Sequence, residues 1–141
     1  MENLNTILGV NLHNASIFDI NEEKLLLLKS KDYYTKSDLF FFLQNELLKN
    51  KDNKDTYSYI NYLISYYIMI ILTPINYEEL AYNYITEALK NSNNVLYKEW
   101  CLIFATIEKP LLSDINAVSL ANDVINEKPE STIANTILML F

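Results

Sequence analysis

The feature that most constrains the fold is the stretch 56–72, TYSYINYLISYYIMIIL, in which almost every residue is apolar or aromatic. From position 57 onward its only polar non-aromatic residues are Ser58, Asn61 and Ser65. Their i, i+3, i+7 spacing places them on one narrow strip of a helix. A helix that is apolar around most of its circumference lies inside a bundle or spans a membrane. Because a span needs about 20 apolar residues and this shorter run carries five tyrosine hydroxyls, we expect a helix buried in a bundle.

The ends and the tyrosines of this helix can also be predicted. Asp55 is a suitable N-cap because its carboxylate can accept a hydrogen bond from a free amide of the first turn, and Pro74 disfavours helical geometry at Thr73. Buried tyrosine rings add apolar area, but each hydroxyl needs a partner or a path to water. We therefore expect the five tyrosines to divide between core and rim positions. They are Tyr57, Tyr59, Tyr62, Tyr66 and Tyr67.

The composition favours an all-α fold in a single domain, residues 1–141. A chain of 141 residues is long enough to bury a core, and one Gly and three Pro are too few for the turns of an all-β fold. Capped amphipathic runs predict about seven helices stacked as antiparallel hairpins, while residues 1–18 have no clear assignment. The expected helices cover residues 23–29, 36–49, 56–72, 77–90, 95–108, 114–127 and 131–141.

Capping residues and one apolar cluster accompany these helices. Asp19 and Glu22 have the spacing of a capping box, and Thr35 begins a weaker one. Further caps are expected at Asn76, at Ser113 or Asp114, and at Ser131. Three large apolar residues lie beside the inner stripe of helix 36–49 and are either covered by the N-terminal segment or left as an exposed patch. We favour cover for these residues, which are Phe41, Phe42 and Leu48.

The two hairpins within residues 56–127 resemble each other at an offset of 36 residues. The aligned pairs are Met69 with Ala105, Ala81 with Ala117, Ile85 with Ala121, and Ala88 with Val124. Small residues at these points let paired helices approach closely, and their spacing resembles the tetratricopeptide pattern. Ser65 and Cys101 stand where that family usually has Trp. The resemblance covers about half of the chain and implies stacked helical hairpins.

The charge of the chain limits its partners. The net charge is −7, and all eleven basic residues are Lys. Because Arg supplies the bidentate contacts to phosphate and guanine, an acidic chain without Arg is a poor candidate for nucleic-acid binding. It is a better candidate for a basic protein partner, although the excess acid is also explained by solubility. The N-terminus lacks both the basic region and the long apolar region of a secretory signal. We therefore expect a cytoplasmic protein.

The sequence offers few residues for catalysis. It contains no Glu-x-x-His pair for a carboxylate metal site, and a single Gly excludes a glycine-rich phosphate loop. His13 lies in a polar segment and is expected at the surface, while Cys101 lies in an apolar helix and is expected in the core. An enzyme would need His13 or a pair of carboxylates in a deep pocket. We therefore expect no enzyme, no metal, no cofactor and no small-molecule substrate.

Two surfaces are candidates for partner binding. The first is an acidic face with tyrosine and amide side chains on helix 77–90, made of Glu78, Glu79, Tyr82, Asn83 and Glu87. Tyrosine supplies rigid contact area and carboxylates steer a basic partner, but the alternative is a plain solvated helix face. The second is the charged loop 50–55 with the adjacent residues Tyr57 and Ser58, and the alternative there is a simple connector.

The chain is rich in Asn, Ile, Leu, Lys and Tyr and has no Arg, as expected from the codons of an AT-rich genome. In this composition, and in size, acidity and lack of catalytic residues, it resembles the immunity proteins of bacterial polymorphic-toxin systems, such as contact-dependent growth inhibition. Those families share no sequence motif, so the resemblance assigns no residue. It implies tight binding to a cognate toxin domain, commonly a basic nuclease, and occlusion of its active site. The alternative function is a tetratricopeptide-like adaptor that binds a peptide or a protein in a groove.

Overall fold

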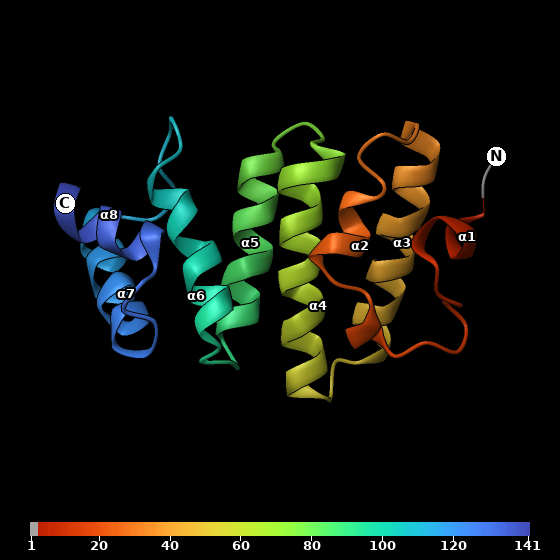
Figure 1. The fold of residues 1–141 in the computed structure, drawn as a ribbon, viewed down its shortest axis with the longest axis horizontal. Helices are drawn as coiled ribbons and strands as arrows, with labels where there is room; N and C mark the ends of the chain where they lie inside the picture. The colour runs from red at the N-terminus through yellow and green to blue at the C-terminus, as the bar shows by residue number, and fades with distance from the viewer. Residues whose placement is uncertain (1–2) are drawn as a thin grey trace.

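The computed structural model describes residues 3–141, and all of its regular structure is helical. The helices stand side by side in a row (Figure 1), with α1–α3 at one end and α7 and α8 at the other. Among the described residues there is no strand, and the expected all-α fold of stacked helical hairpins is confirmed. Met1 and Glu2, part of the unassigned stretch and of the expected domain, lie outside the described residues. The α-helices are α1 (Leu4–Leu8), α2 (Glu22–Leu26), α3 (Tyr33–Lys49), α4 (Lys54–Tyr67), α5 (Tyr77–Leu89), α6 (Val95–Leu102), α7 (Asp114–Glu127) and α8 (Thr132–Leu140).

Three short helical segments complete the fold: the 3-10 turns η1 (Ile17–Asp19) and η3 (Ile103–Ala105), and the π-helical turn η2 (Ile68–Leu72). The segment η2 continues α4 and ends where Thr73 takes a left-handed backbone conformation before Pro74, with φ at 41°. None of the helices formed by residues 3–141 has both the length and the apolar character that a membrane span requires.

The N-terminal cap of α4 differs from the expected one. Asn53 is the cap, and its side chain accepts a hydrogen bond from the Thr56 amide at 3.3 Å. Asp55 lies in the first turn instead, where its negative charge favours the helix dipole. The same correction applies upstream, because Asn21 caps α2 in place of Asp19 and Asp32 caps α3 in place of Thr35.

The polar strip of α4 is buried against its neighbours. The Ser65 hydroxyl donates to the Ala81 carbonyl of α5 at 2.6 Å and accepts from the Trp100 indole of α6 at 2.8 Å. The small side chains of Ser65 on α4 and Ala81 on α5 permit this short distance, because a larger side chain at either position would separate the two helices. One hydroxyl therefore joins three helices, and α4 lies at the centre of the row (Figure 1).

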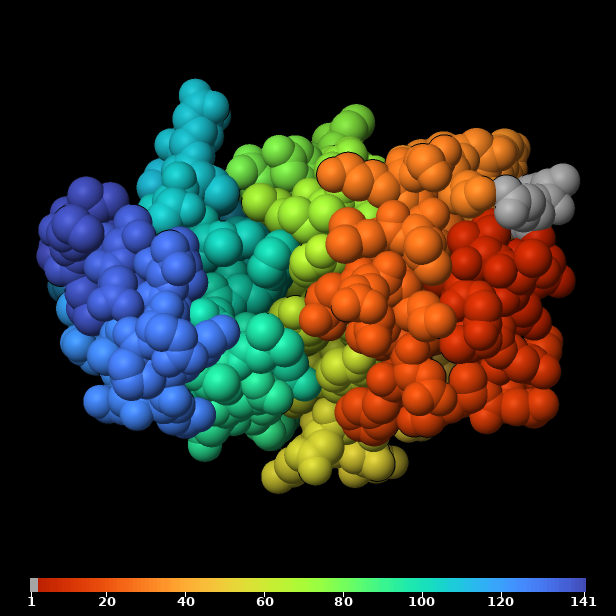
Figure 2. Space-filling view, viewed as in Figure 1, coloured from red at the N-terminus to blue at the C-terminus, as the bar shows by residue number. Residues whose placement is uncertain are grey.

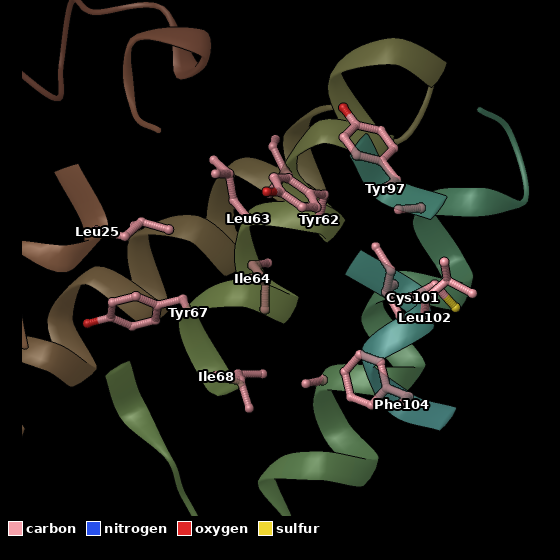
Figure 3. Close-up of a cluster of buried hydrophobic side chains, with 14 of the residues drawn as sticks. Leu25, Tyr62, Leu63, Ile64, Tyr67, Ile68, Tyr97, Cys101, Leu102 and Phe104 are labelled. Carbon is pink, nitrogen blue, oxygen red and sulfur yellow. The ribbon is translucent and has the colours of Figure 1, made fainter. Parts of the chain in front are cut away.

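The tyrosines of α4 divide as expected between core and rim. Tyr62 and Tyr67 are buried, whereas Tyr57, Tyr59 and Tyr66 are half-buried. The Tyr67 hydroxyl donates to the Lys36 carbonyl at 2.6 Å, and Tyr62 stacks on Tyr97 with ring centroids 4.9 Å apart. Figure 3 shows these rings within an apolar cluster to which α2, α4, η2, α6 and η3 contribute, with Tyr67 on the side of Leu25 and Tyr62 on the side of Tyr97.

The second hairpin, α6 with α7, repeats the first in its small buried residues. Ala81 in α5 and Ala117 and Ala121 in α7 are completely buried. The helix expected over 95–108 is shorter, because α6 ends at Leu102 and η3 follows. Ser113 caps α7 and Ser131 caps α8, as predicted, while Asn76 occupies the cap position of α5 without a side-chain bond.

The N-terminal segment covers only the end of the row at α3 and α4, where the red and darker orange atoms of Figure 2 lie. Its α1 ends at Gly9, whose φ of 69° requires the left-handed conformation that glycine adopts readily. This segment leaves two of the three apolar residues of α3 uncovered. The expected cover is therefore wrong for Phe41 and Leu48, which are 66% and 60% exposed, and only Phe42 packs partly against the core.

Candidate functional site

The five residues of the expected acidic face lie on two flanks of α5. Tyr82 is half-buried and packs on Phe104 of η3, with ring centroids 5.4 Å apart. Asn83 and Glu87 line a hollow on the side of α3 and α4. Glu79 is exposed, and Glu78 is half-buried. Because α5 is packed between α4 and α6, one helix face cannot present all five side chains to a partner.

The second candidate surface meets the first at a single contact. The Tyr57 hydroxyl donates to the Glu87 carboxylate at 3.3 Å, across the α4–α5 hairpin. Ser58 is 1% exposed and does not line the hollow beside Tyr57. Residues 51–55 of the loop are exposed. The two surfaces thus converge beside Tyr57, at the end of the hairpin where α4 begins and α5 ends.

A small hollow at this contact forms the candidate site, which we call the notch. It has a volume of about 190 Å³. The last turns of α3, the first turns of α4 and the second half of α5 position its walls. The lining residues are Leu47, Tyr57, Asn61, Asn83, Tyr84 and Glu87. A volume below the roughly 300 Å³ at which sites for drug-sized ligands begin favours one side chain over a cofactor.

The notch carries a negative charge on Glu87. Lys90, which follows the last residue of α5, donates to this carboxylate at 2.7 Å. That hydrogen bond lowers the pKa of Glu87, burial opposes the shift, and the positive charge of Lys90 and the bond from Tyr57 lower the pKa further. Glu87 is therefore a carboxylate at neutral pH. Lys90 is 67% exposed on its side chain, and an exposed pair of this kind adds only about 0–1 kcal/mol.

The notch also contains an acceptor without a donor. Asn61 is 1% exposed, and its Nδ2 donates to the Tyr57 carbonyl at 3.0 Å. Its Oδ1 is buried and has no hydrogen-bond partner. A buried unpaired acceptor costs about 1–3 kcal/mol, and such groups are uncommon in folded proteins. Among the residues that line the notch, Asn61 therefore has a buried side-chain oxygen for which the described part of the protein supplies no hydrogen-bond donor.

An apolar hollow lies beyond the notch along the same side of α5, and Tyr84 lines both. The Gln44 amide of α3 donates to the Tyr84 hydroxyl. The second hollow has a volume of about 230 Å³ and is lined by Tyr33, Ser37, Phe40, Phe41, Ile68, Leu72, Pro74, Leu80 and Tyr84. Tyr33 and Phe41 are 64% and 66% exposed. The two hollows lie next to each other between α3 and α5, one acidic and one apolar, with the contact between Gln44 and Tyr84 separating them, and we call the pair the groove.

The other candidate residues lie apart from this groove. His13 is exposed and borders two hollows near the N-terminal segment. Cys101 is a core residue, as expected, and burial raises the pKa of its thiol to about 12. Within residues 3–141, no group of three or more His, Cys, Asp or Glu side chains is arranged to hold a metal ion.

Sequence reasoning missed three residues of the notch, which are Leu47, Asn61 and Tyr84. Asn61 belongs to the polar strip recognised on α4, and its presence on the most apolar helix was a usable signal. Tyr84 is not part of the expected acidic face, and its contact with Gln44 depends on how α3 packs, which no local pattern shows. Of the expected residues, only Asn83, Glu87 and Tyr57 line the notch.

Comparison with known proteins adds no relative from which a function could be transferred. No protein-family model, no curated protein and no solved structure matches the chain. The resemblances to tetratricopeptide repeats and to immunity proteins therefore carry no family assignment. The geometry of the groove and the chemistry of its side chains are the basis for a functional proposal.

Proposed function

We propose that the protein is an immunity-type inhibitor, which acts in the cytoplasm by binding a basic toxin domain and covering its active site. The observation that carries this proposal is the groove between α3 and α5, which places exposed aromatic side chains beside a carboxylate. Tyr33 and Phe41 line the apolar hollow and are exposed to solvent, and Glu87 lines the notch. Exposed apolar patches rimmed by polar groups are typical of protein–protein interfaces.

The charge distribution supports a basic partner. The chain has a net charge of −7, Glu87 lines the notch, and Glu79 is exposed on the same helix. Carboxylates around an aromatic patch accelerate the approach of a cationic surface and fix its orientation. A basic nuclease domain has such a surface, because it binds a phosphate backbone.

The decisive experiment is co-expression with the C-terminal domain encoded by the gene immediately upstream. The proposal expects that this domain is toxic alone, that growth is rescued by the inhibitor, and that the two proteins purify as one complex. A harmless neighbour that forms no complex would contradict the proposal.

Charge reversal then tests the surface. The substitutions Glu78→Lys, Glu79→Lys and Glu87→Lys are expected to weaken toxin binding without unfolding the domain, with Glu87→Lys the most severe because this carboxylate lines the notch. Calorimetric titration measures the affinity, and circular dichroism verifies the fold. Equal affinity of all three variants and the wild type would exclude this side of α5.

A tetratricopeptide-like adaptor is the second candidate function. The stacking of α4–α5 on α6–α7, with Ala81, Ala117 and Ala121 completely buried, favours it because adaptors of that class bind peptides on stacked hairpins. The two functions differ in partner number and affinity. A pull-down that yields several partners of modest affinity would favour the adaptor, and one tightly bound protein would favour the inhibitor.

A further inference from the structure

We infer that the notch receives a single arginine side chain of the protein partner, whose guanidinium is bound by the Glu87 carboxylate and the Asn61 Oδ1. This inference rests on the proposed function in one respect, since the arginine belongs to the partner that the groove binds. It goes further by naming the chemical group that enters the notch. It also names the two acceptors that bind it.

Asn61 gives the first argument. Asn61 lines the notch, its Oδ1 is unpaired and shielded from solvent, and its Nδ2 is already bonded to the Tyr57 carbonyl. A donor therefore reaches this oxygen only by displacing the side chains that cover it. A ligand that pairs with Asn61 must therefore be a hydrogen-bond donor. Arginine carries five N–H donors and no acceptor, so it can pair with the amide oxygen and with a carboxylate at the same time.

Glu87 gives the second argument. Its carboxylate is ionised and about one-third exposed, and its present cation, Lys90, lies on the outer surface with most of its side chain in solvent. An exposed i, i+3 pair is easily exchanged. A guanidinium that enters from solvent can replace Lys90 at the carboxylate and form two parallel hydrogen bonds there, which an ammonium cannot do.

The walls and the size of the notch give the third argument. Two tyrosine rings, Tyr57 and Tyr84, line it on α4 and α5, and a planar guanidinium stacks on aromatic faces. The volume of the notch, about 190 Å³, is below the roughly 300 Å³ at which sites for drug-sized ligands begin. That space suits one long side chain and excludes a folded segment.

The apolar hollow defines the surroundings of this arginine. Leu80 borders the apolar hollow and Glu87 borders the notch, seven residues apart on α5, which is about 10 Å along a helix. The partner should therefore place a bulky apolar side chain about 10 Å from its arginine, on the other side of the contact between Gln44 and Tyr84.

The test uses free probes, so that it needs no partner. N-acetyl-arginine amide is titrated at millimolar concentrations into the ¹⁵N-labelled protein, and the side-chain amide signals of Asn61 and Asn83 are followed by NMR. We expect a saturable shift of both signals. N-acetyl-citrulline amide, which has the same shape without the charge, is expected to produce no saturable shift, and N-acetyl-lysine amide is expected to bind more weakly than the arginine probe.

Variants assign the effect to the notch. Glu87→Gln is expected to weaken arginine binding about tenfold, the loss of one charge-assisted hydrogen bond. Glu127→Gln removes the same charge from an exposed position of α7, away from the groove, and is expected to leave the affinity within about twofold, as a change in screened surface charge should. Lys90→Gln removes the competing cation and is expected to strengthen binding by about threefold.

Asn61→Leu separates a binding role from a structural one. It should abolish the arginine response and raise the midpoint of thermal unfolding, because it removes a buried acceptor that has no donor. If the amide had only a structural role, the substitution would lower that midpoint. An unshifted Asn61 signal, or equal losses in Glu87→Gln and Glu127→Gln, would overturn the inference. A protein that binds the arginine probe in the notch but fails to rescue cells from the toxin would contradict the proposed function alone.

Discussion

Ser65 and Asn61 lie about one turn apart on the same strip of α4, and they differ in whether their buried polar atoms have hydrogen-bond partners. Ser65 is completely buried with its hydroxyl bonded to α5 and to α6. Asn61 is equally buried, but its Oδ1 has no partner. The first group is complete without a ligand and stabilises the fold. The second lies at the edge of the groove and costs stability, which is typical of a group retained for binding.

The largest effect on stability is expected at Ser65. Ser65→Ala should lower the free energy of unfolding by about 2 kcal/mol, because the Trp100 indole loses its acceptor inside the protein. Urea unfolding followed by circular dichroism measures this loss. Ser58→Ala is the matched control: its buried hydroxyl has no partner, so the same substitution should cost less than about 0.5 kcal/mol. Equal losses at both serines would refute the distinction between paired and unpaired groups.

A second paired group, Glu99, extends the comparison to α8. Its carboxylate accepts from Lys128 at 2.9 Å and from the Ser131 hydroxyl at 2.6 Å. Burial raises the pKa of Glu99, but the bonds from Ser131 and Lys128 outweigh it and the net pKa is lowered. Glu99→Gln should therefore cost about 1 kcal/mol at neutral pH, whereas Glu127→Gln on the exposed side of α7 should cost almost nothing.

The lowered pKa also fixes the sign of the pH dependence. A carboxyl group with a folded pKa below its unfolded value contributes stability above the unfolded value and loses that contribution as the pH falls through the folded one. The stability of the wild type should thus decrease as the pH falls below about 4.5, the ordinary value for Glu99 and Glu87. In Glu99→Gln this decrease should be shallower. Identical pH profiles would show that Glu99 is not paired in solution.

The unpaired group should respond in the opposite direction. Asn61→Leu is expected to raise the free energy of unfolding by about 1 kcal/mol, because it removes a buried acceptor without a donor and adds apolar contact. Thermal and urea unfolding measure the gain. A loss of stability as large as that of Ser65→Ala would mean that the bond from Asn61 to the Tyr57 carbonyl matters more than the unpaired oxygen.

The smallest effect is expected at the exposed surface of α5. Glu79→Lys should change the free energy of unfolding by less than about 0.5 kcal/mol. If the partner is basic, the same change should slow association several-fold and leave dissociation nearly unchanged. Stopped-flow mixing with the partner separates the two rates. A faster dissociation would place Glu79 in the contact itself.

Much of the fold could be predicted because periodic patterns follow from burial. The positions of Ala81, Ala117 and Ala121 in the hairpins show this, since small residues recur where helices approach. The caps were less certain because Asn53 and Asp55 are both acceptable N-caps two residues apart, and only the path of the loop decides between them. The exposure of Phe41 depends on where the N-terminal segment crosses α3, which no local pattern contains.

The candidate site was predicted in part for the same reason. Glu87 and Asn83 were expected at a binding surface because their residue types and helix position favour one. The notch needs Tyr57 from α4 and Tyr84 from α5 at the same place, and such a meeting depends on tertiary packing. The sequence pattern contained Asn61 but not the absence of a donor for it, which is visible only when all neighbours are placed.

The bond between Ser65 and the indole of Trp100 also gives the protein an optical reporter. Trp100 is the single tryptophan among eleven tyrosines, and the Tyr66 ring lies 5.1 Å from it. Excitation energy absorbed by the tyrosines of α4 can therefore be transferred to Trp100. The wavelength of maximum tryptophan emission depends on the polarity around the indole. Any motion that separates α6 from α4 would weaken this transfer and expose the indole to water. The emission spectrum would thus report the integrity of the central helices without an added dye.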